Sequence, residues 1–302
     1  MLKGNNRRSA ACIIVALVLI LITVPCLISL AVSRYSVKVT YLNLQSDKIQ
    51  NPFTLVQLTD LHGATFGEDN ARLIAKIDEI NPDAVLMTGD MIDEDGDVTV
   101  AVALVTKLAE TYDVYFSLGN HEQDCITGNK TDPVGIFEKA GAVVLEKEYA
   151  DCEINENKVR IGGTSGYALG VKFWEDTYFK DADNYYYSDG FAEQRFMLDF
   201  ENTDSYKILL LHRPEASTLW NRDGWFDVDI VLSGHTHGGI VRFPFIGGLY
   251  APEEGFFPKY EYGLYSVDGV ITYISSGLSG AKGIPRFNNI PEIVSLTVTP
   301  CE

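Results

Sequence analysis

The segment from Phe53 to His62, FTLVQLTDLH, begins the part of the chain whose pattern indicates the fold. The run from Phe53 to Thr59 is mainly apolar and short enough for a buried strand. It is followed directly by Asp60 and His62. The segment therefore predicts a strand that delivers two polar side chains at its carboxyl end.

The same design recurs further along the chain, where short apolar runs alternate with segments of helical periodicity. Apolar residues in the segment 70–80 recur at a helical spacing, and Asn81-Pro82-Asp83 ends that segment. Further strands are predicted at 84–87, 114–118, 207–211, 228–232 and 293–298. Further helices are predicted at 98–109 and 214–220, and one more helix is predicted to end at 137–141. This alternation predicts an α/β domain in which helices cover parallel strands.

The remaining segments predict hairpins and loops around this framework. Runs at 149–154 and 158–162 flank a turn, as do 263–266 and 270–274. Residues 35–51 are expected to form a short extended entry segment. The aromatic, Gly- and Asp-containing stretch 165–190 is interpreted as a long loop or cap rather than a second domain. We therefore expect one domain over 35–302.

The N-terminal segment predicts attachment to a membrane. Residues 10–32 form an apolar stretch that is long enough to cross a bilayer of roughly 30 Å as a helix. Lys3, Arg7 and Arg8 precede it and predict a cytoplasmic N-terminus, which would place 35–302 outside the cytoplasm. Residues 1–34 are thus expected to form a cytoplasmic tip and a single transmembrane anchor. The alternative is a signal peptide cleaved near Ser33, where 31–33 have the small-residue pattern of a cleavage site.

Composition excludes some classes of function. The formal net charge is −18, and a surface this acidic repels the nucleic-acid backbone, so no nucleic-acid partner is expected. The five cysteines show no zinc-binding spacing and no disulfide framework. A bridge between Cys125 and Cys152 stays open, because sequence alone cannot decide it.

Polar residues at the predicted strand ends indicate a metal site. All five histidines of the chain fall in these segments. The segments are Asp60-Leu61-His62, Gly89-Asp90, Gly119-Asn120-His121-Glu122, His212 and Gly234-His235-Thr236-His237-Gly238. Ligands of open α/β sheets bind at the carboxyl ends of the strands, so the segments are expected to converge. Carboxylate, amide and imidazole ligands favour Mn, Fe or Zn.

Spacing within the segments adds a second expectation. Residues two apart in an extended segment point to the same side, so Asp60 with His62, and His235 with His237, would each supply two ligands to one site. The alternative for Asp60 and Asp90 is that they cap the helices that follow them.

These segments resemble the calcineurin-like metallophosphoesterase superfamily, also seen in purple acid phosphatases, whose motifs are D-x-H, GD, GNH with an acidic residue, a lone H and GHxH. All five motifs occur in order over roughly 53–298. The pairs Gly238-Gly239 and Gly277-Leu278 are similar, more weakly, to a membrane-anchored or exported bacterial subgroup of phosphodiesterases. The resemblance implies a four-layer αββα sandwich and two divalent or trivalent ions. It assigns Asp60, His62 and His237 to one metal, Asn120, His212 and His235 to the other, Asp90 to both, and His121 to the substrate.

The implied activity is metal-dependent hydrolysis of a phosphoester, with diesters slightly preferred, by a hydroxide that two cations activate. His121 would donate a proton to the leaving group, oriented by Asp60 or Glu122. The substrate would be a phosphoester, and a lipid- or cell-envelope-linked phosphoester is one candidate. Arg242 and Arg286 are candidates to contact the phosphate, and the alternative is that they form ion pairs. The aromatic residues Phe256-Phe257 and Tyr185-Tyr186-Tyr187 would contact such a substrate, and the alternative is that they pack within loops. The alternatives are cleavage of a pyrophosphate bond in a nucleotide-linked lipid precursor, and a metal-stabilised binding module without turnover.

Overall fold

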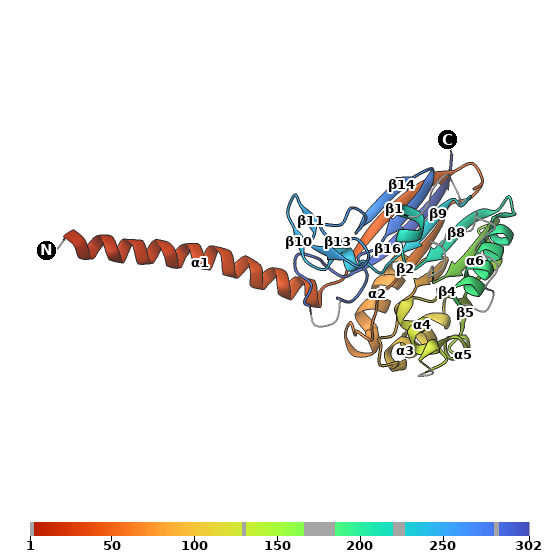
Figure 1. Ribbon diagram of the computed structural model, residues 1–302, viewed down its shortest axis with the longest axis horizontal. Helices are drawn as coiled ribbons and strands as arrows, with labels where there is room; N and C mark the ends of the chain where they lie inside the picture. Colours follow the sequence, from red (N-terminus) through yellow and green to blue (C-terminus); the bar gives the residue numbers. More distant parts are fainter. Residues whose placement is uncertain (1–2, 129–130, 166–184, 220–226, 281–283, 302) are drawn as a thin grey trace.

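Two six-stranded sheets face each other in the computed structural model, which describes residues 3–128, 131–165, 185–219, 227–280 and 284–301 (Figure 1). In the first sheet, β2 to β5 run parallel, and β16 joins β2 antiparallel and β1 parallel. Its strands, in spatial order, are β1 (Lys38–Ser46), β16 (Glu292–Pro300), β2 (Phe53–Leu58), β3 (Ala84–Thr88), β4 (Asp113–Ser117) and β5 (Ala142–Leu145).

The second sheet has a parallel centre with an antiparallel hairpin at each edge. Strands β7, β8, β9 and β15 are parallel, and β6 and β14 pair antiparallel with β7 and β15. The spatial order is β14 (Gly263–Val267), β15 (Val270–Ile274), β9 (Ile230–Ser233), β8 (Tyr206–Leu211), β7 (Asn157–Thr164) and β6 (Glu148–Ile154). The two predicted hairpins are confirmed.

Helices cover the outer face of each sheet and complete four layers. On the first sheet lie α2 (Ala71–Ile80), α3 (Thr99–Ala109), α4 (Asn120–Thr127) and α5 (Pro133–Lys139). On the second lie α6 (Tyr185–Glu201) and α7 (Glu215–Thr218). Short elements fill the loops: η1 (Glu68–Asn70), η3 (His237–Gly239), and the small hairpins β10 (Arg242–Phe243) with β11 (Gly247–Gly248) and β12 (Tyr250–Ala251) with β13 (Gly255–Phe256).

Alternation along the strands explains why the layers form. In β2, Val56 packs in the core under the first set of helices, whereas Leu55 packs between the two sheets. In β8, Leu210 belongs to the core between the sheets and Leu209 to the core under α6 and α7. Successive strand residues point to opposite faces, so a strand that is apolar throughout must be covered on both. The predicted αββα sandwich is confirmed.

The loop expected at 165–190 is partly wrong. Residues 166–184 lie outside the described residues, but α6 begins at Tyr185. The helix is stabilised by tertiary packing, because a Cβ at Gly162 of β7 would lie 2.6 Å from the ring of Phe200. The absent side chain lets Phe196 and Phe200 pack against the sheet, an effect that local composition does not reveal.

Two other expectations are corrected or settled. The entry segment contains a full strand, β1, which pairs with β16 over nine residues. All five cysteines lie in the described part of the chain and are free, so Cys125 and Cys152 form no bridge.

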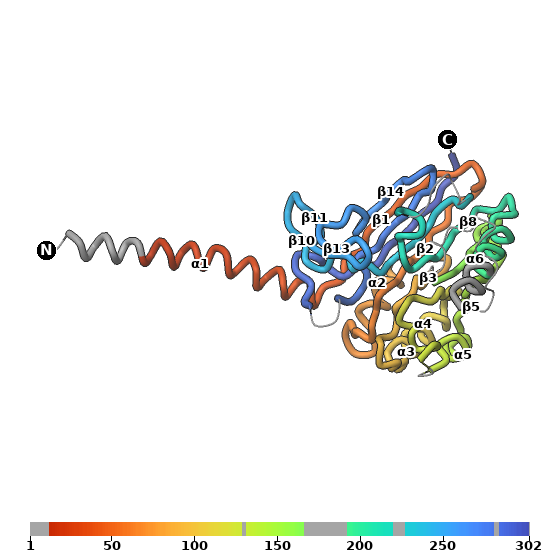
Figure 2. Tube along the Cα trace, in the orientation of Figure 1, coloured from red at the N-terminus to blue at the C-terminus, as the bar shows by residue number. Residues whose placement is uncertain are grey.

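The N-terminal helix α1 (Lys3–Tyr35) extends away from the sandwich (Figures 1 and 2). Its portion Cys12–Tyr35 is long and apolar enough to cross a membrane. Its last turns contact the folded part, where the hydroxyl groups of Ser29 and Ser33 accept hydrogen bonds from the backbone N–H groups of Asn288 and Asn289 at 2.9 and 3.1 Å. Ser33 is only 1% exposed.

Candidate metal centre

The loops that follow β2, β3, β4, β8 and β9 meet at one end of the two sheets. They bring all five histidines together: the ring of His62 lies 4.6 Å from that of His121 and 5.1 Å from that of His237, and the ring of His212 lies 5.2 Å from that of His235. Parallel strands end at the same edge within each sheet. The edges of the two sheets meet here, so that Asp60 of the first sheet lies beside His235 and His237 of the second.

The candidate ligands form two groups of three. Asp60, His62 and His237 have one ligand atom each within 4.8 Å of one another, and so do Asp90, His212 and His235. Each group has the spacing that a single cation needs.

Asp90 belongs to the second group and also faces the first. Its Oδ2 is 3.0 Å from Nε2 of His212 and 3.8 Å from Nε2 of His62. It is therefore placed to contact a cation in either group.

The backbone at these residues differs from the extended conformation that the spacing argument assumed. The φ angles of Asp60, His62, Asp90, His235 and His237 are 54°, 45°, 52°, 69° and 48°. The alternation of an extended segment therefore does not apply here: Asp60 and His62 lie in one group, whereas His235 and His237 lie in different groups, as the resemblance implied. Non-glycine residues rarely adopt positive φ, and such strain concentrates at functional sites.

Two glycines of the motifs leave room for carboxylates of the centre that lie close to their backbone. A Cβ at Gly119 would lie 2.2 Å from Oδ1 of Asp90, and a Cβ at Gly234 would lie 2.5 Å from Oδ2 of Asp60. Either side chain would displace a carboxylate of the centre.

The donor atoms fit cations. Nε2 of His62 and Oδ1 of Asn120 are buried and have no hydrogen-bond partner among the described residues, whereas Nε2 of His212 faces Oδ2 of Asp90 at 3.0 Å. Buried polar atoms are nearly always paired, so two unpaired ones that line the same cavity fit residues that would hold a cation. Oxygen and imidazole nitrogen donors without thiolate suit Mn, Fe or Zn.

Hydrogen bonds fix which ring nitrogen of each histidine is available. Nδ1 of His212 lies 2.7 Å from the carbonyl oxygen of Thr88, and Nδ1 of His237 lies 3.1 Å from that of Ser279. A carbonyl oxygen only accepts, so Nδ1 carries a proton in both rings, and Nε2 is the nitrogen available to a metal.

His235 has the opposite arrangement, because its Nε2 lies 3.1 Å from Oε2 of Glu253, which also pairs with Arg213. Nδ1 is thus the nitrogen left for a metal. Glu253 was missed by sequence reasoning, because it lies in the loop between β12 and β13 and no motif includes it.

Charges within the centre shift several pKa values. Burial lowers the pKa of His212, but the attraction of Asp90 and Asp60 outweighs burial and raises that pKa to about 10. Burial raises the pKa of Asp90, yet the attraction of His212 lowers it overall. Burial lowers the pKa of His237 to about 4, so this imidazole is neutral at neutral pH and free to bind a cation.

Asp93 is the carboxylate that faces His121, in place of the expected Asp60 or Glu122. Its Oδ1 lies 3.5 Å from Nδ1 of His121, and Nε2 of the same ring lies 3.8 Å from Oδ2 of Asp90. Sequence reasoning missed Asp93, although an acidic residue three positions after Asp90 was a signal that could have been weighed.

Glu122 instead holds the loops in place. Its two oxygens accept hydrogen bonds at 2.8–3.1 Å from the backbone N–H groups of Gly119, Asp90, Met91 and Ile92. Burial, and then repulsion by Asp90, raise the pKa of Glu122. This buried carboxylate ties the loop after β3 to the start of α4.

Asp60 and Asp90 do not cap the helices that follow them in sequence, although Asp90 does bind the start of another helix. Oδ1 of Asp90 accepts a hydrogen bond from the backbone N–H of His121 at the start of α4, not from the helix that follows Asp90 in sequence. Both oxygens of Asp60 accept from the backbone N–H of His235. The two carboxylates thus tie separate loops to each other.

The two candidate arginines differ. Arg242 pairs with Glu261 at 3.2 Å and donates to the carbonyl oxygen of Gly238. Arg286 is buried and lines the cavity of the centre, although Nε donates to the carbonyl oxygen of Asn289. Burial lowers the pKa of Arg286 to about 10, which leaves it cationic at neutral pH.

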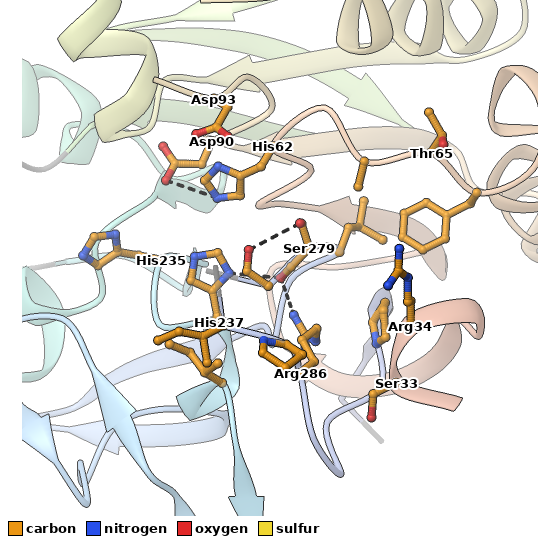
Figure 3. A pocket seen from close by; sticks show the side chains of 18 of the residues that line it. Ser33, Arg34, His62, Thr65, Asp90, Asp93, His235, His237, Ser279 and Arg286 are labelled. Carbon is orange, nitrogen blue, oxygen red and sulfur yellow. Dashed lines mark hydrogen bonds and ion pairs between the residues drawn. The ribbon is translucent and has the colours of Figure 1, made fainter. Parts of the chain in front are cut away.

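A cavity of about 1180 Å³ opens over the centre (Figure 3). It is lined by His62, Asp90, Asn120, His121, His235 and His237, among others, whereas His212 and Asp60 lie beneath its surface.

Comparison with known proteins agrees with the motifs. The family model of calcineurin-like phosphoesterases matches residues 53–239. The chain is 27% identical to the metallophosphoesterase YkuE of Bacillus subtilis, over 82% of this chain and 79% of that protein. It is 25% identical to phosphodiesterase YaeI of Escherichia coli, over 81% and 82%. It is 31% identical to the metallophosphoesterase Cj0846 of Campylobacter jejuni, over 80% of this chain and 56% of that protein.

Solved structures give a weaker match. A 5'-nucleotidase precursor from Thermus thermophilus aligns with a TM-score of 0.45 at 16% identity, over 75% of this chain and 50% of that one. From the match of its family model, this chain belongs to the calcineurin-like phosphoesterase family, and it is a metallophosphoesterase, a hydrolase that acts on phosphoester bonds.

Proposed function

We propose that the chain hydrolyses phosphodiesters in preference to monoesters, with two metal ions held by the two ligand groups that share Asp90. The observation that carries this proposal is the position of Asp90, whose Oδ2 faces a histidine of each group at 3.0 and 3.8 Å. The named activity of the relative YaeI supports the preference for diesters.

The ions would be Mn, Fe or Zn. Asp60, His62 and His237 would hold one ion, Asn120, His212 and His235 the other, and Asp90 both. When bound, two cations lower the pKa of a water and offset charge on the phosphoryl oxygens.

His121 supplies the proton that the leaving group needs. In hydrolysis the oxygen of water bonds to phosphorus, the bond between phosphorus and the leaving oxygen breaks, and that oxygen takes a proton. Nε2 of His121 faces the cavity beside Asp90, while Asp93 lies beside Nδ1. The carboxylate faces Nδ1, so Nε2 is the nitrogen directed towards the leaving oxygen. A binding module without turnover has no use for this pair.

The proposed location is the outer face of the cell membrane, with α1 retained as a single-pass anchor. The basic residues before the apolar segment support the orientation. The burial of Ser33 and its hydrogen bond with Asn289 support retention, because cleavage there would remove a packed part of the fold. A substrate of the cell envelope follows from that location.

The test uses the full chain in detergent, stripped of metal and reloaded separately with Mn, Fe or Zn. Rates are compared on bis-p-nitrophenyl phosphate, p-nitrophenyl phosphate and a nucleotide-linked pyrophosphate. We expect the diester to be hydrolysed fastest, and Asp90→Ala to lose turnover. The exposed Asp47 gives the matched control, Asp47→Ala. Unchanged turnover in Asp90→Ala would contradict the two-ion site, and fastest cleavage of the pyrophosphate would favour that alternative.

A further inference from the structure

The cavity of the metal centre is built in part by the membrane helix. Leu30, Ser33, Arg34 and Tyr35 from the last turns of α1 line the same cavity as the candidate ligands (Figure 3). The apolar part of α1 that could cross a membrane is Cys12–Tyr35, so these lining residues stand where the chain leaves the bilayer. The cavity therefore reaches from the metal centre to the expected membrane surface.

Hydrogen bonds fix the helix end against the centre. Asn289 donates through its backbone to the hydroxyl of Ser33 at 3.1 Å and through Nδ2 to the carbonyl oxygen of His237 at 2.7 Å. Nη1 of Arg72 donates to the carbonyl oxygen of Tyr35 at 3.2 Å. One asparagine thus connects the membrane helix to a candidate metal ligand, and the position of the cavity relative to the bilayer is set by the fold.

The lining of the cavity combines charged and apolar side chains. Arg34, Arg72 and Arg286 line it together with the carboxylates of Asp90, Asp93 and Glu94. Guanidinium groups pair with phosphate, so these arginines would add to cations held at the centre in attracting a phosphate. The lining also includes Leu30 of α1 and Ile284, and Ile284 is half exposed. This combination suits a molecule with an anionic head and an apolar tail.

Exposed apolar side chains continue from the cavity over the small hairpins. Phe243, Phe245, Ile246, Phe256 and Phe257 are 40–109% exposed, and we call them the apolar rim. Tyr250 lines the cavity, and its ring lies 5.5 Å from that of Phe256. Figure 1 shows β10, β11 and β13 at the end of the sandwich that faces α1.

Such a rim beside a membrane helix is best covered by lipid. Aromatic and aliphatic side chains at this position insert into the interfacial region of a bilayer, and a contiguous exposed patch of this kind marks an interaction site. The rim is continuous with the anchor through the cavity lining, so the bilayer that holds α1 is its natural occupant.

We propose that the substrate is a membrane lipid with an anionic phosphodiester headgroup, which enters the cavity from the bilayer between α1 and the apolar rim. The headgroup reaches the metal centre while the acyl chains stay in the membrane. Water cleaves one of the two ester bonds of the phosphate, and His121 gives its proton to the oxygen that leaves. This proposal rests on the proposed function, since it assigns the substrate of that same site.

The experiment compares three phosphodiesters with the metal-loaded full chain in dodecyl maltoside micelles. They are phosphatidylglycerol, its deacylated counterpart glycerophosphoglycerol, and bis-p-nitrophenyl phosphate. We expect kcat/KM for the lipid to exceed that for the deacylated compound by at least about tenfold, because only the lipid is concentrated at the micelle surface. Equal values for the two would overturn the proposal.

The apolar rim is tested with Phe245→Ser/Phe256→Ser, and the control is Tyr41→Ser, an exposed aromatic residue on β1. We expect the double variant to lower kcat/KM on the lipid by about tenfold and to leave the rate on bis-p-nitrophenyl phosphate unchanged. An unchanged lipid rate, or an equal fall on both substrates, would overturn the proposal. Wild-type turnover of bis-p-nitrophenyl phosphate without lipid turnover refutes only this inference, whereas no turnover of any diester refutes the proposed function.

Discussion

Nδ1 of His121 lies 3.5 Å from Oδ1 of Asp93, and this contact sets the opposite nitrogen of the ring towards the cavity. His121 and Asp93 lie with His62 in a further group of three, whereas the two groups that contain His237 and His212 do not include His121. The relationship leads to the first prediction.

His121→Ala is expected to lower kcat on a phosphodiester by about 10²–10⁴-fold, the usual contribution of a general acid. Metal content should stay at the wild-type level, because the two ligand groups are intact. The measurement pairs steady-state rates with metal analysis of the same samples. Asp93→Asn should give a smaller loss of kcat, and Asp95→Asn, at an exposed position nearby, should give none. Loss of metal from His121→Ala would show that the ring is a ligand instead.

Glu122→Ala is expected to lower the free energy of unfolding by roughly 3 kcal/mol, because it leaves buried backbone N–H groups without an acceptor. Metal binding should weaken as well, since two of those groups belong to Asp90 and Gly119. Chemical denaturation and metal titration measure the two effects. Glu138→Ala, at an exposed position on α5, is the control. A variant as stable as wild type would contradict the assigned role.

Glu253→Gln is expected to weaken the binding of one of the two ions by about 10–100-fold, the usual effect of removing a carboxylate that orients a histidine ligand. The carboxylate lies within hydrogen-bond distance of Nε2 of His235, and this hydrogen bond lowers the pKa of Glu253. Titration calorimetry on the metal-free chain would resolve the weakened step. Asp268→Asn in the turn between β14 and β15 should bind both ions normally. Equal weakening of both ions would argue that the change disturbs the whole centre.

The metal-free chain is expected to be most stable near pH 6.5. The pKa of His212 is raised from 6.5 to about 10, so its contribution is full below pH 6.5 and is lost as the pH rises towards 10. The pKa of His237 is lowered to about 4, so protonation of the unfolded chain destabilises the fold as the pH falls from 6.5 towards 4. Thermal unfolding in the presence of a chelator measures both limbs.

The alkaline limb has a specific control. His212→Gln should remove the loss of stability between pH 6.5 and 10, whatever its effect on absolute stability. Metal-loaded protein should also lack this limb, because the cation replaces the proton on His212. An unfolding temperature that is flat over this range in the metal-free wild type would refute the assignment.

Cys301 reports the side of the membrane on which the domain lies. It is a free, exposed cysteine near the C-terminus. A maleimide that cannot cross membranes should label it in intact cells if the domain is outside, and Cys301→Ser should abolish that labelling. Labelling that appears only after permeabilisation would place the domain in the cytoplasm.

The sequence was sufficient to predict the parallel strands and the helices that cover them, because these strands are apolar on both faces. A segment such as FTLVQL cannot leave either side in water, so the parallel sheet with covering helices follows from composition and order. It was insufficient for α6, whose packing depends on the empty space over Gly162 in a distant strand.

The sequence by itself determined which residue types would meet at the carboxyl ends of the strands, because parallel strands that alternate with helices end at a common edge. Only the tertiary structure decided how those residues divide. His235 and His237 lie in separate groups, whereas Asp60 and His62, with similar left-handed backbone, share one. Asp93 and Glu253 reach their histidines across loop contacts. Local sequence patterns cannot express such contacts, because they depend on the distance between segments in the folded chain.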